Sequence, residues 1–364
     1  MSRSQASALA GLGRRGLAVV GAVGLVAVLV VLGVAFPRSI AGDLVQIMFA
    51  KGTLASALRL SVPIALAALG GIFAEKSGVI NIGLEGLLII SAFAAIYAMD
   101  LSNNLWIAFG GGVLASTLLA GLFAVVCIEF RADQIIAGLA VWLIALGLAP
   151  FASQVVYNAP NSDSVRTPPT LPDLAGGIPV VGDVQAALGD LPFLGALFSA
   201  SVTVYLMFLM VLASWYVLNR TQFGRWIRAS GENPKALDTA GVNVSRVRYA
   251  AVLLSGVLSG MGGASLSLSL GQFTGNGPTM VNGKGFIAIV AYLFGNYNPI
   301  GAFLSTMLFA GLDALQIALQ LRDVGVPNQL VRITPFVMVI VVLALVGRTR
   351  LPSAAGEHYE SGED

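Results

Sequence analysis

The sequence predicts an all-α, polytopic membrane protein with about ten transmembrane or re-entrant helices. Of its 364 residues, 57% are hydrophobic and 10% are charged, and the mean hydropathy is +0.86. A soluble chain carries roughly a quarter charged residues, so this composition indicates the bilayer. The apolar residues form runs of about 18 or more rather than the alternating segments of membrane β-strands, so the spans are expected to be helices.

The predicted spans follow one another along most of the chain. The first follows Arg14 and Arg15, and it is longer than the apolar core of a signal peptide and lacks a convincing cleavage site, so we expect it to be retained. The third and the eighth are interrupted by glycines, which is typical of re-entrant or broken helices. The ten spans are expected near residues 16–36, 54–74, 79–99, 105–128, 134–153, 197–218, 249–270, 280–295, 300–320 and 329–347.

The distribution of positive charge predicts the orientation of these spans. If both termini are cytoplasmic, thirteen of the twenty Lys and Arg residues fall in inner segments and five in outer ones. Inner loops are enriched in these residues, so this orientation is favoured. Residues 1–15 then form a cytoplasmic N-terminus, 16–347 the transmembrane domain and 348–364 a cytoplasmic tail. The tail is polar and acidic from Leu351 onwards, so it is predicted to be disordered.

The longest segment between spans, 154–196, is predicted to lie outside the cell. It is rich in Pro and Gly, so we expect an irregular loop or a short surface helix rather than a span. Two interpretations remain open for it, a simple connector and a docking surface for an external binding protein.

Several classes of function are not supported by the residues present. The single Cys127 and the single His358 provide no disulfide framework and no zinc ligand set. The phosphate-binding pattern GxxxxGK[ST] and the catalytic pattern HExxH are both absent, so this chain is expected to bind no ATP itself and to be no enzyme. Nothing in the sequence predicts binding to a nucleic acid polymer.

A basic segment, 220–248, separates two apolar runs and carries six of the twenty basic residues. Asn233 is suited to cap a helix and Pro234 to begin it, and Gly241 is suited to end it after about two turns, at Ala240. Ala236, Leu237 and Ala240 give this short helix a small apolar face, and such a helix needs a partner surface to be stable. The alternative is a solvated basic loop that only sets topology.

Two further clusters place polar residues at membrane depth, where they are costly and often functional. The segment 75–86 contains Asn81 and Glu85, which are four residues apart and are expected to share a helix face. The segment 282–299 begins with a polar cluster near Asn282 and Phe286 and ends in another, which leaves only a short helix between them. A small-residue stretch, 255–264, is interpreted as a helix-packing face.

Three of these segments together resemble the membrane permeases of ABC importers. They read EKSGVINIGLEG at 75–86, GRWIRASGENPKALDTAG at 224–241 and GKGFIAIVAYLFGNYNPIG at 283–301. The resemblance covers about 52–347 and is closest to the ribose-type family, in its nucleoside-type branch, where this chain resembles the second, smaller permease of a pair.

The resemblance implies partners for this chain. These are an ATPase subunit that binds ATP and Mg, a second permease that is identical or homologous, and an extracytoplasmic substrate-binding protein, all at a bacterial cytoplasmic (inner) membrane. It also implies that 224–241 is the coupling helix that contacts the ATPase. The candidate coupling residues are Gly224, Arg228, Gly231, Glu232, Asn233, Pro234, Ala236, Ala240 and Gly241; the candidate translocation-path residues are Asn81, Glu85, Asn282 and Phe286.

The expected function is that of a permease subunit of an ABC importer for nucleosides. A permease for ribose or another simple sugar is the alternative within the same family. An ion-coupled secondary transporter is an alternative from another class, and it would use carboxylates within the spans, such as Glu85, Glu129 and Asp313.

Overall fold

The computed structural model describes most of the chain, and all regular structure in the described residues is helical. The described residues are 39–170, 179–322 and 350–359, with short pieces at 31–32, 35–36 and 172–173. Within them, β-pairing is limited to two isolated bridges, Asn161 with Thr274 and Thr170 with Ser201. The prediction of an all-α membrane protein is confirmed.

Seven helices in the described part of the chain are long and apolar enough to cross a membrane. Predicted spans 16–36 and 329–347 lie outside the described residues, apart from 31–32 and 35–36, so the count of about ten is not confirmed. The seven helices are α4 (Lys51–Lys76), α5 (Leu84–Ser102), α6 (Leu105–Ala124) with its π-helical end η1 (Val125–Glu129), α7 (Gln134–Tyr157), α11 (Val202–Arg220), α14 (Val244–Leu270) and α16 (Pro299–Arg322).

The two spans expected to be broken differ from one another. The eighth is α15 (Lys284–Phe294), which has 11 residues. At 1.5 Å per residue it is far shorter than the hydrocarbon core of about 30 Å, so the prediction of a short helix is confirmed. The expectation that the third span is broken is wrong, because α5 runs unbroken over 19 residues. The non-helical part, 77–83, lies before α5 and joins it to α4.

The core of the molecule is built around α4 and α14. Both are largely buried, and α4 packs against α11, α14, α15 and α16. Helices α6, α7, α11 and α16 form the periphery, where Leu118, Ile136, Leu212 and Leu304 are each more than half exposed. Large apolar side chains of this kind are stable against lipid or a partner subunit, which agrees with a membrane location.

The small-residue stretch of α14 lets its backbone approach α6 closely. A Cβ at Gly260 would lie 2.8 Å from the Val113 Cα, which is too close for any side chain. Ser116 donates to the Gly256 carbonyl at 2.8 Å, and Ser91 of α5 donates to the Gly260 carbonyl at 2.6 Å. The predicted packing role of this stretch is therefore confirmed.

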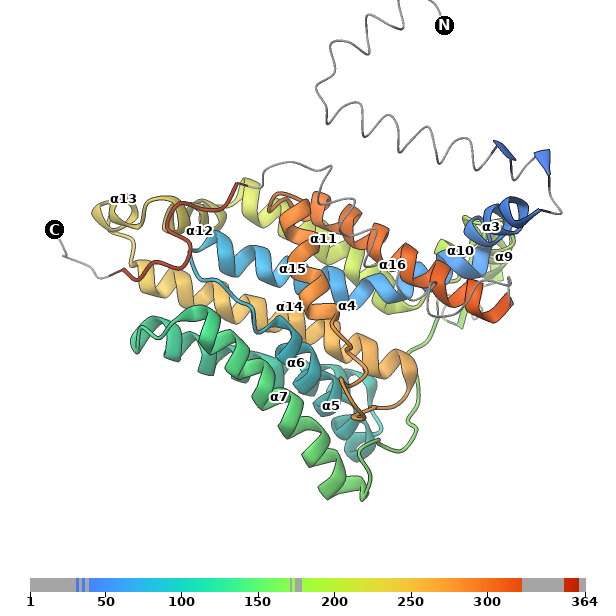
Figure 1. Ribbon diagram of the computed structural model, residues 1–364, viewed down its shortest axis with the longest axis horizontal. Helices are drawn as coiled ribbons and strands as arrows, with labels where there is room; N and C mark the ends of the chain where they lie inside the picture. Colours follow the sequence, from blue (N-terminus) through green and yellow to red (C-terminus); the bar gives the residue numbers. More distant parts are fainter. Residues whose placement is uncertain are drawn as a thin grey trace, which may run out of the picture.

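The segments predicted to lie on opposite sides of the membrane are found at opposite ends of the molecule. At one end are α12 (Gln222–Glu232), α13 (Pro234–Thr239) and the C-terminal residues 350–359. At the other end are α3 (Ile40–Met48), α9 (Pro179–Gly189) and α10 (Gly195–Phe198) (Figure 1). The arrangement agrees with the order of crossings that the charge pattern predicts.

The segment predicted as an external loop starts later than expected, because α7 continues to Tyr157. After α7, the chain forms backbone hydrogen bonds with the residues that follow α14. Ser162 donates its N–H to the Phe273 carbonyl at 2.9 Å, and Val165 donates its N–H to the Gly271 carbonyl at 2.7 Å. The segment then includes helix α9. It combines the two expected forms, irregular chain and a short surface helix.

Candidate functional site

Helix α13 has the capping arrangement that the sequence predicts. The Asn233 Oδ1 accepts a hydrogen bond from the Ala236 N–H at 3.0 Å, and Pro234 occupies the first helical position, where no N–H is needed. The helix ends at Thr239, one residue before the expected Ala240, which is the C-cap. Gly241 follows with a φ of +80°, a left-handed conformation that glycine adopts without strain.

The small face of α13 is open at the surface. Leu237 is buried and fixes the helix to the protein, whereas Ala236 and Ala240 are exposed. The exposed side of the helix also carries Lys235 and Thr239, and the two methyl groups beside them allow a second protein to approach the helix backbone closely. This is the geometry expected of a helix that docks in a groove.

Two of the candidate coupling residues have packing roles inside this chain. Gly224 and Gly231 of α12 are buried, and a Cβ at Gly231 would collide with the Lys76 carbonyl oxygen. Beside it, Ser230 donates to the Ser77 carbonyl at 2.8 Å. Helix α12 thus rests directly on the end of α4. That these two glycines also contribute to contact with an ATPase stays a prediction.

The remaining candidate coupling residues surround the junction of α12 and α13. Arg228 is half-buried, and its Nε lies 3.4 Å from the Gly224 carbonyl. Glu232 is exposed at the end of α12, and Asn233 follows it at the surface. The structure brings the candidate residues together in one surface segment, 224–241, in which α12 is followed directly by α13. This segment is called the elbow below.

Residues 350–359 form a C-terminal strap across this elbow, so the predicted disorder of the tail is wrong for these residues. Ala354 donates its N–H to the Gly231 carbonyl at 2.8 Å, and Gly356 donates to the Gly78 carbonyl at 2.9 Å. Pro352 and Ala354 are buried. Backbone groups of the loop 77–83 and of α12 thereby gain partners, and composition alone does not report such fixed contacts.

Side chains extend the contacts of the strap to other elements. Ser353 donates to the Glu232 carboxylate at 3.0 Å, and the Tyr359 hydroxyl donates to the Asp238 carboxylate of α13 at 2.9 Å. At the other end of the strap, the Arg350 N–H donates to the Asn296 Oδ1 at 3.1 Å. Desolvation, followed by the Asp238 hydrogen bond and charge, raises the pKa of Tyr359, so this hydroxyl stays a donor at neutral pH.

Arg248 is also covered by the strap. It is only 4% exposed, and its Nη1 donates to the Glu357 carbonyl at 2.7 Å. Among the described residues, its Nε and Nη2 have no hydrogen-bond partner. The sequence counted Arg248 among the basic residues of an inner loop, and the structure instead places it in the first turns of α14, beneath the tail.

A buried carboxylate joins the end of α4 to the short helix α15. Glu75 is 5% exposed and accepts hydrogen bonds from the hydroxyl groups of Tyr292 and Tyr297, the latter at 2.7 Å. The partners lie more than 200 positions away along the chain, and no local pattern marks them. The sequence therefore identified Glu75 as a polar residue at membrane depth without identifying what it binds.

A second buried carboxylate holds the N-terminus of α15. Glu85 is 2% exposed, and its two oxygens accept from the N–H groups of Gly283 at 2.7 Å and Gly285 at 2.6 Å. These are N–H groups without partners inside the helix, and the helix dipole also favours a negative charge at this end. Glu85 thus connects α5 to the start of α15.

The candidate path residues do not all meet. Asn282 and Phe286 flank the N–H groups that Glu85 binds, and Phe286 packs edge-on against Trp142 with ring centroids 5.4 Å apart. The expectation that Asn81 shares a helix face with Glu85 is wrong, because Asn81 lies in the non-helical loop before α5. It donates to Ser255 of α14 at 3.1 Å and accepts from the Gly83 N–H at 3.0 Å.

Comparison with known proteins decides the family. A family model described as "branched-chain amino acid transport system / permease component" matches residues 53–343. The chain belongs to this permease family. Its members are transport subunits, so the expectation of a permease rather than an enzyme is confirmed, and so is the resemblance drawn from the three sequence motifs.

Relatives of this permease are similar over most of their length. The chain is 34% identical over 333 residues to the guanosine ABC transporter permease protein NupQ of Bacillus subtilis, which covers 88% of this chain and 99% of NupQ. It is 35% identical over 320 residues to the nucleoside ABC transporter permease protein NupC of Lactococcus lactis, covering 84% and 95%. A putative glucose ABC transporter permease protein of Haloferax volcanii, TsgC13, is 33% identical over 273 residues, covering 75% and 79%. No solved structure matches the chain.

The contacts of the strap lead to a testable expectation for this permease. Gly356 has a φ of +82°, and a Cβ there would lie 3.1 Å from the Ile80 Cδ1. Gly356→Val should therefore loosen the strap, because a branched side chain is strained in this conformation and crowds Ile80. Hydrogen exchange should become faster at residues 77–83 and 231–241. His358→Ala, at an exposed strap position, is the control and should change little. Unchanged exchange in the Gly356 variant would show that the strap does not restrain these segments.

Proposed function

We propose that this chain is a permease subunit of an ABC importer for nucleosides. The observation that supports it most is the similarity to NupQ and NupC, which extends over 99% and 95% of those two proteins. Similarity of this extent includes both the buried core and the surface elbow at α12 and α13. The resemblance of 75–86, 224–241 and 283–301 to nucleoside-type permeases agrees with it.

The proposed mechanism is alternating access driven by a separate ATPase. A permease component of this family implies an ATP-binding partner and a substrate-binding partner. ATP and Mg bind to the ATPase, whose closure pushes on α13 and the elbow. Because α12 rests on the end of α4, and Glu75 joins the same end to α15, a movement of the elbow reaches the helices that hold the path.

The wider arrangement is part of the same proposal. Two permease subunits, identical or homologous, assemble with two ATPases and an extracytoplasmic binding protein in a bacterial cytoplasmic membrane. Residues 1–15, 220–248 and 348–364 are cytoplasmic, and 154–196 is external. Glu85, Asn282 and Phe286 lie next to the solute path, and Asn81 supports it from the loop before α5.

Transport assays separate this proposal from its alternatives. The chain is reconstituted with its cognate second permease, ATPase and binding protein, and uptake of labelled guanosine, ribose and glucose is measured with and without ATP. We expect uptake of guanosine that depends on ATP. Unlabelled nucleosides should compete with this uptake, and sugars should not. Uptake of ribose or glucose alone would favour a sugar permease, an alternative that the name of TsgC13 keeps open. Uptake without ATPase would favour an ion-coupled transporter.

Cysteine labelling tests the orientation. In a background where the buried Cys127 is replaced by Ser, Thr167→Cys should react with a membrane-impermeant maleimide added to intact cells. Lys235→Cys should react only after the membrane is opened. Both positions are exposed in the structure, so a difference in labelling reports the side of the membrane rather than burial. Labelling of 235 from outside would reverse the proposed topology.

A further inference from the structure

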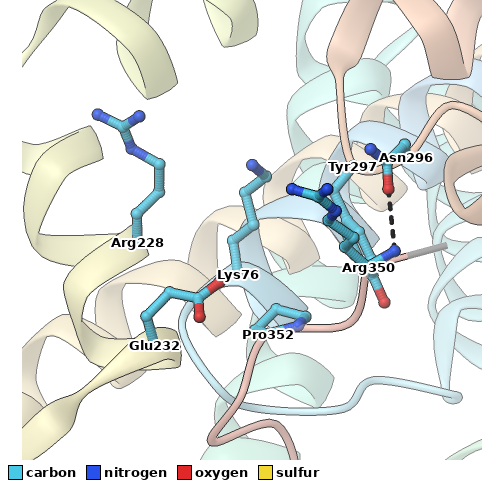
Figure 2. A pocket seen from close by; sticks show the side chains of 7 residues that line it. All are labelled: Lys76, Arg228, Glu232, Asn296, Tyr297, Arg350 and Pro352. Carbon is cyan, nitrogen blue, oxygen red and sulfur yellow. Dashed lines mark hydrogen bonds between the residues drawn. The ribbon is translucent and has the colours of Figure 1, made fainter.

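A pocket with excess positive charge lies beneath the C-terminal strap. Its volume is about 220 Å³. Figure 2 shows that its walls come from the end of α4, from α12, from the turn after α15 and from the strap itself. The lining residues are Lys76, Arg228, Glu232, Asn296, Tyr297, Arg350 and Pro352.

The positive groups of this pocket are only partly neutralised by the described part of the chain, because Lys76 is attracted by Glu232 but repelled by Arg228. Lys76 and Arg228 are half-buried, and no ion pair among the described residues involves either of them or Arg350. Glu232 is the one carboxylate in the lining, and its Oε2 already accepts from Ser353. In Figure 2 the Arg228 side chain extends away from the Glu232 carboxylate. Three cations and one carboxylate leave a charge of +2, whose mutual repulsion a bound anion would offset.

The polar groups that remain free in the pocket are mainly donors. The Lys76 ammonium and the guanidinium groups of Arg228 and Arg350 supply donors only. The Asn296 Oδ1 is occupied by the Arg350 N–H, which leaves the amide NH₂ of Asn296 as a further donor. The Tyr297 hydroxyl donates to Glu75. A ligand that fits this set carries several acceptor oxygens and a double negative charge.

We propose that this pocket binds a phosphate group, carried either by a lipid headgroup or by a soluble phosphate. A phosphate has acceptor oxygens for guanidinium and ammonium donors from several directions, and as a dianion it matches the charge of the pocket. Through Arg350 it would connect the strap to Lys76 of α4 and Arg228 of α12. Because these residues lie beside the elbow, the bound phosphate would hold the strap against it.

The pocket is accessible to both sources of phosphate. Lys76 ends a membrane-spanning helix, where lipid headgroups lie, and Arg350 is exposed at the surface. The site is separate from Glu85 and the other candidate path residues, none of which lines it. Binding can therefore be measured without any assumption about the transported solute.

Two binding measurements on the full-length chain test the proposal. In neutral detergent and at constant ionic strength, equilibrium dialysis with radiolabelled inorganic phosphate reports the soluble source. In nanodiscs, native mass spectrometry compares retention of phosphatidic acid with that of diacylglycerol, which has the same acyl chains and no phosphate. The test variants are Lys76→Gln combined with Arg350→Gln, and Arg350→Gln alone, which changes only an exposed strap side chain. The control is Arg225→Gln, an exposed arginine of α12 outside the pocket.

The expected result is saturable binding in at least one arm, weakened tenfold or more by the double variant, weakened less by Arg350→Gln, and unchanged by Arg225→Gln. A charge-assisted hydrogen bond contributes enough free energy for an effect of this size. Binding of phosphatidic acid alone identifies a lipid headgroup, and binding of inorganic phosphate alone identifies a soluble ligand. The proposal is overturned if neither ligand binds, or if Arg225→Gln weakens binding as much as the double variant does.

Discussion

Replacement of Glu85 by Ala is expected to reduce uptake at least tenfold while the permease still reaches the membrane. The carboxylate binds the N–H groups of Gly283 and Gly285, and at 2% exposure no water can replace it easily. Its removal leaves two donors at the buried start of α15 without partners, and each such group costs about 1–3 kcal/mol. Since α15 has only 11 residues and its position depends on its ends, loss of this anchor should displace it.

Two other variants define the cause of the effect. Glu85→Gln keeps one acceptor oxygen but presents an NH₂ group to the second N–H, so uptake should fall between wild type and Glu85→Ala. Asp100→Asn removes a carboxylate from an exposed position near the other end of α5 and should leave uptake nearly unchanged. Uptake and abundance are measured together. Normal uptake by Glu85→Ala at normal abundance would show that the contact between Glu85 and the start of α15 has no importance for transport.

The sequence predicted what depends on local pattern. Long apolar runs predicted the spans, and the cap at Asn233 with Pro234 after it predicted the start of α13 because a cap is made within four residues. Gly241 predicted its end for the same reason. The short α15 followed from the polar clusters on either side of it. In each case, the residues that decide the structure belong to one continuous stretch of the chain.

What the sequence did not predict depends on contacts between distant residues. Glu75 finds Tyr292 and Tyr297, and Arg248 finds the Glu357 carbonyl, only after the helices have packed. The strap was expected to be disordered because its composition is polar. Its order comes from hydrogen bonds to backbone groups of Gly78 and Gly231, and composition does not report these. Asn81 was expected on the same helix as Glu85, but that helix begins three residues after Asn81. Asn81 instead accepts a hydrogen bond from the Gly83 N–H in the loop before the helix.

These long-range contacts meet at one place, the end of α4. Ser77 accepts from Ser230 of α12, Glu75 binds the tyrosines at the end of α15, and Gly78 accepts from the strap. A force applied to the elbow therefore acts on a junction in which α4 and α15 share a buried carboxylate. Packed interfaces of this kind shift as rigid units rather than deforming gradually. The end of α4 thus joins the surface contact to the helices next to the proposed path.

The surface side of this junction gives the second strong prediction, for Ala236→Trp. Ala236 is exposed on α13, whereas Leu237 is buried and fixes the helix, so a bulky residue at 236 should leave the fold of the permease intact. The N–H of residue 236 still reaches the Asn233 cap, because that bond uses the backbone. A Trp side chain would instead prevent a partner groove from closing on the helix.

The expected result is a permease of normal abundance and monodispersity that no longer retains its ATPase. A loss of about 2 kcal/mol at a central contact already weakens binding roughly thirtyfold. Co-purification of the ATPase and substrate-stimulated hydrolysis are compared for wild type, Ala236→Trp and Gln222→Trp. The control adds the same bulk at an exposed residue at the start of α12, away from α13, and should retain the ATPase. If Ala236→Trp keeps both ATPase binding and uptake, α13 is not the coupling helix and the elbow serves only to set the topology of a basic loop.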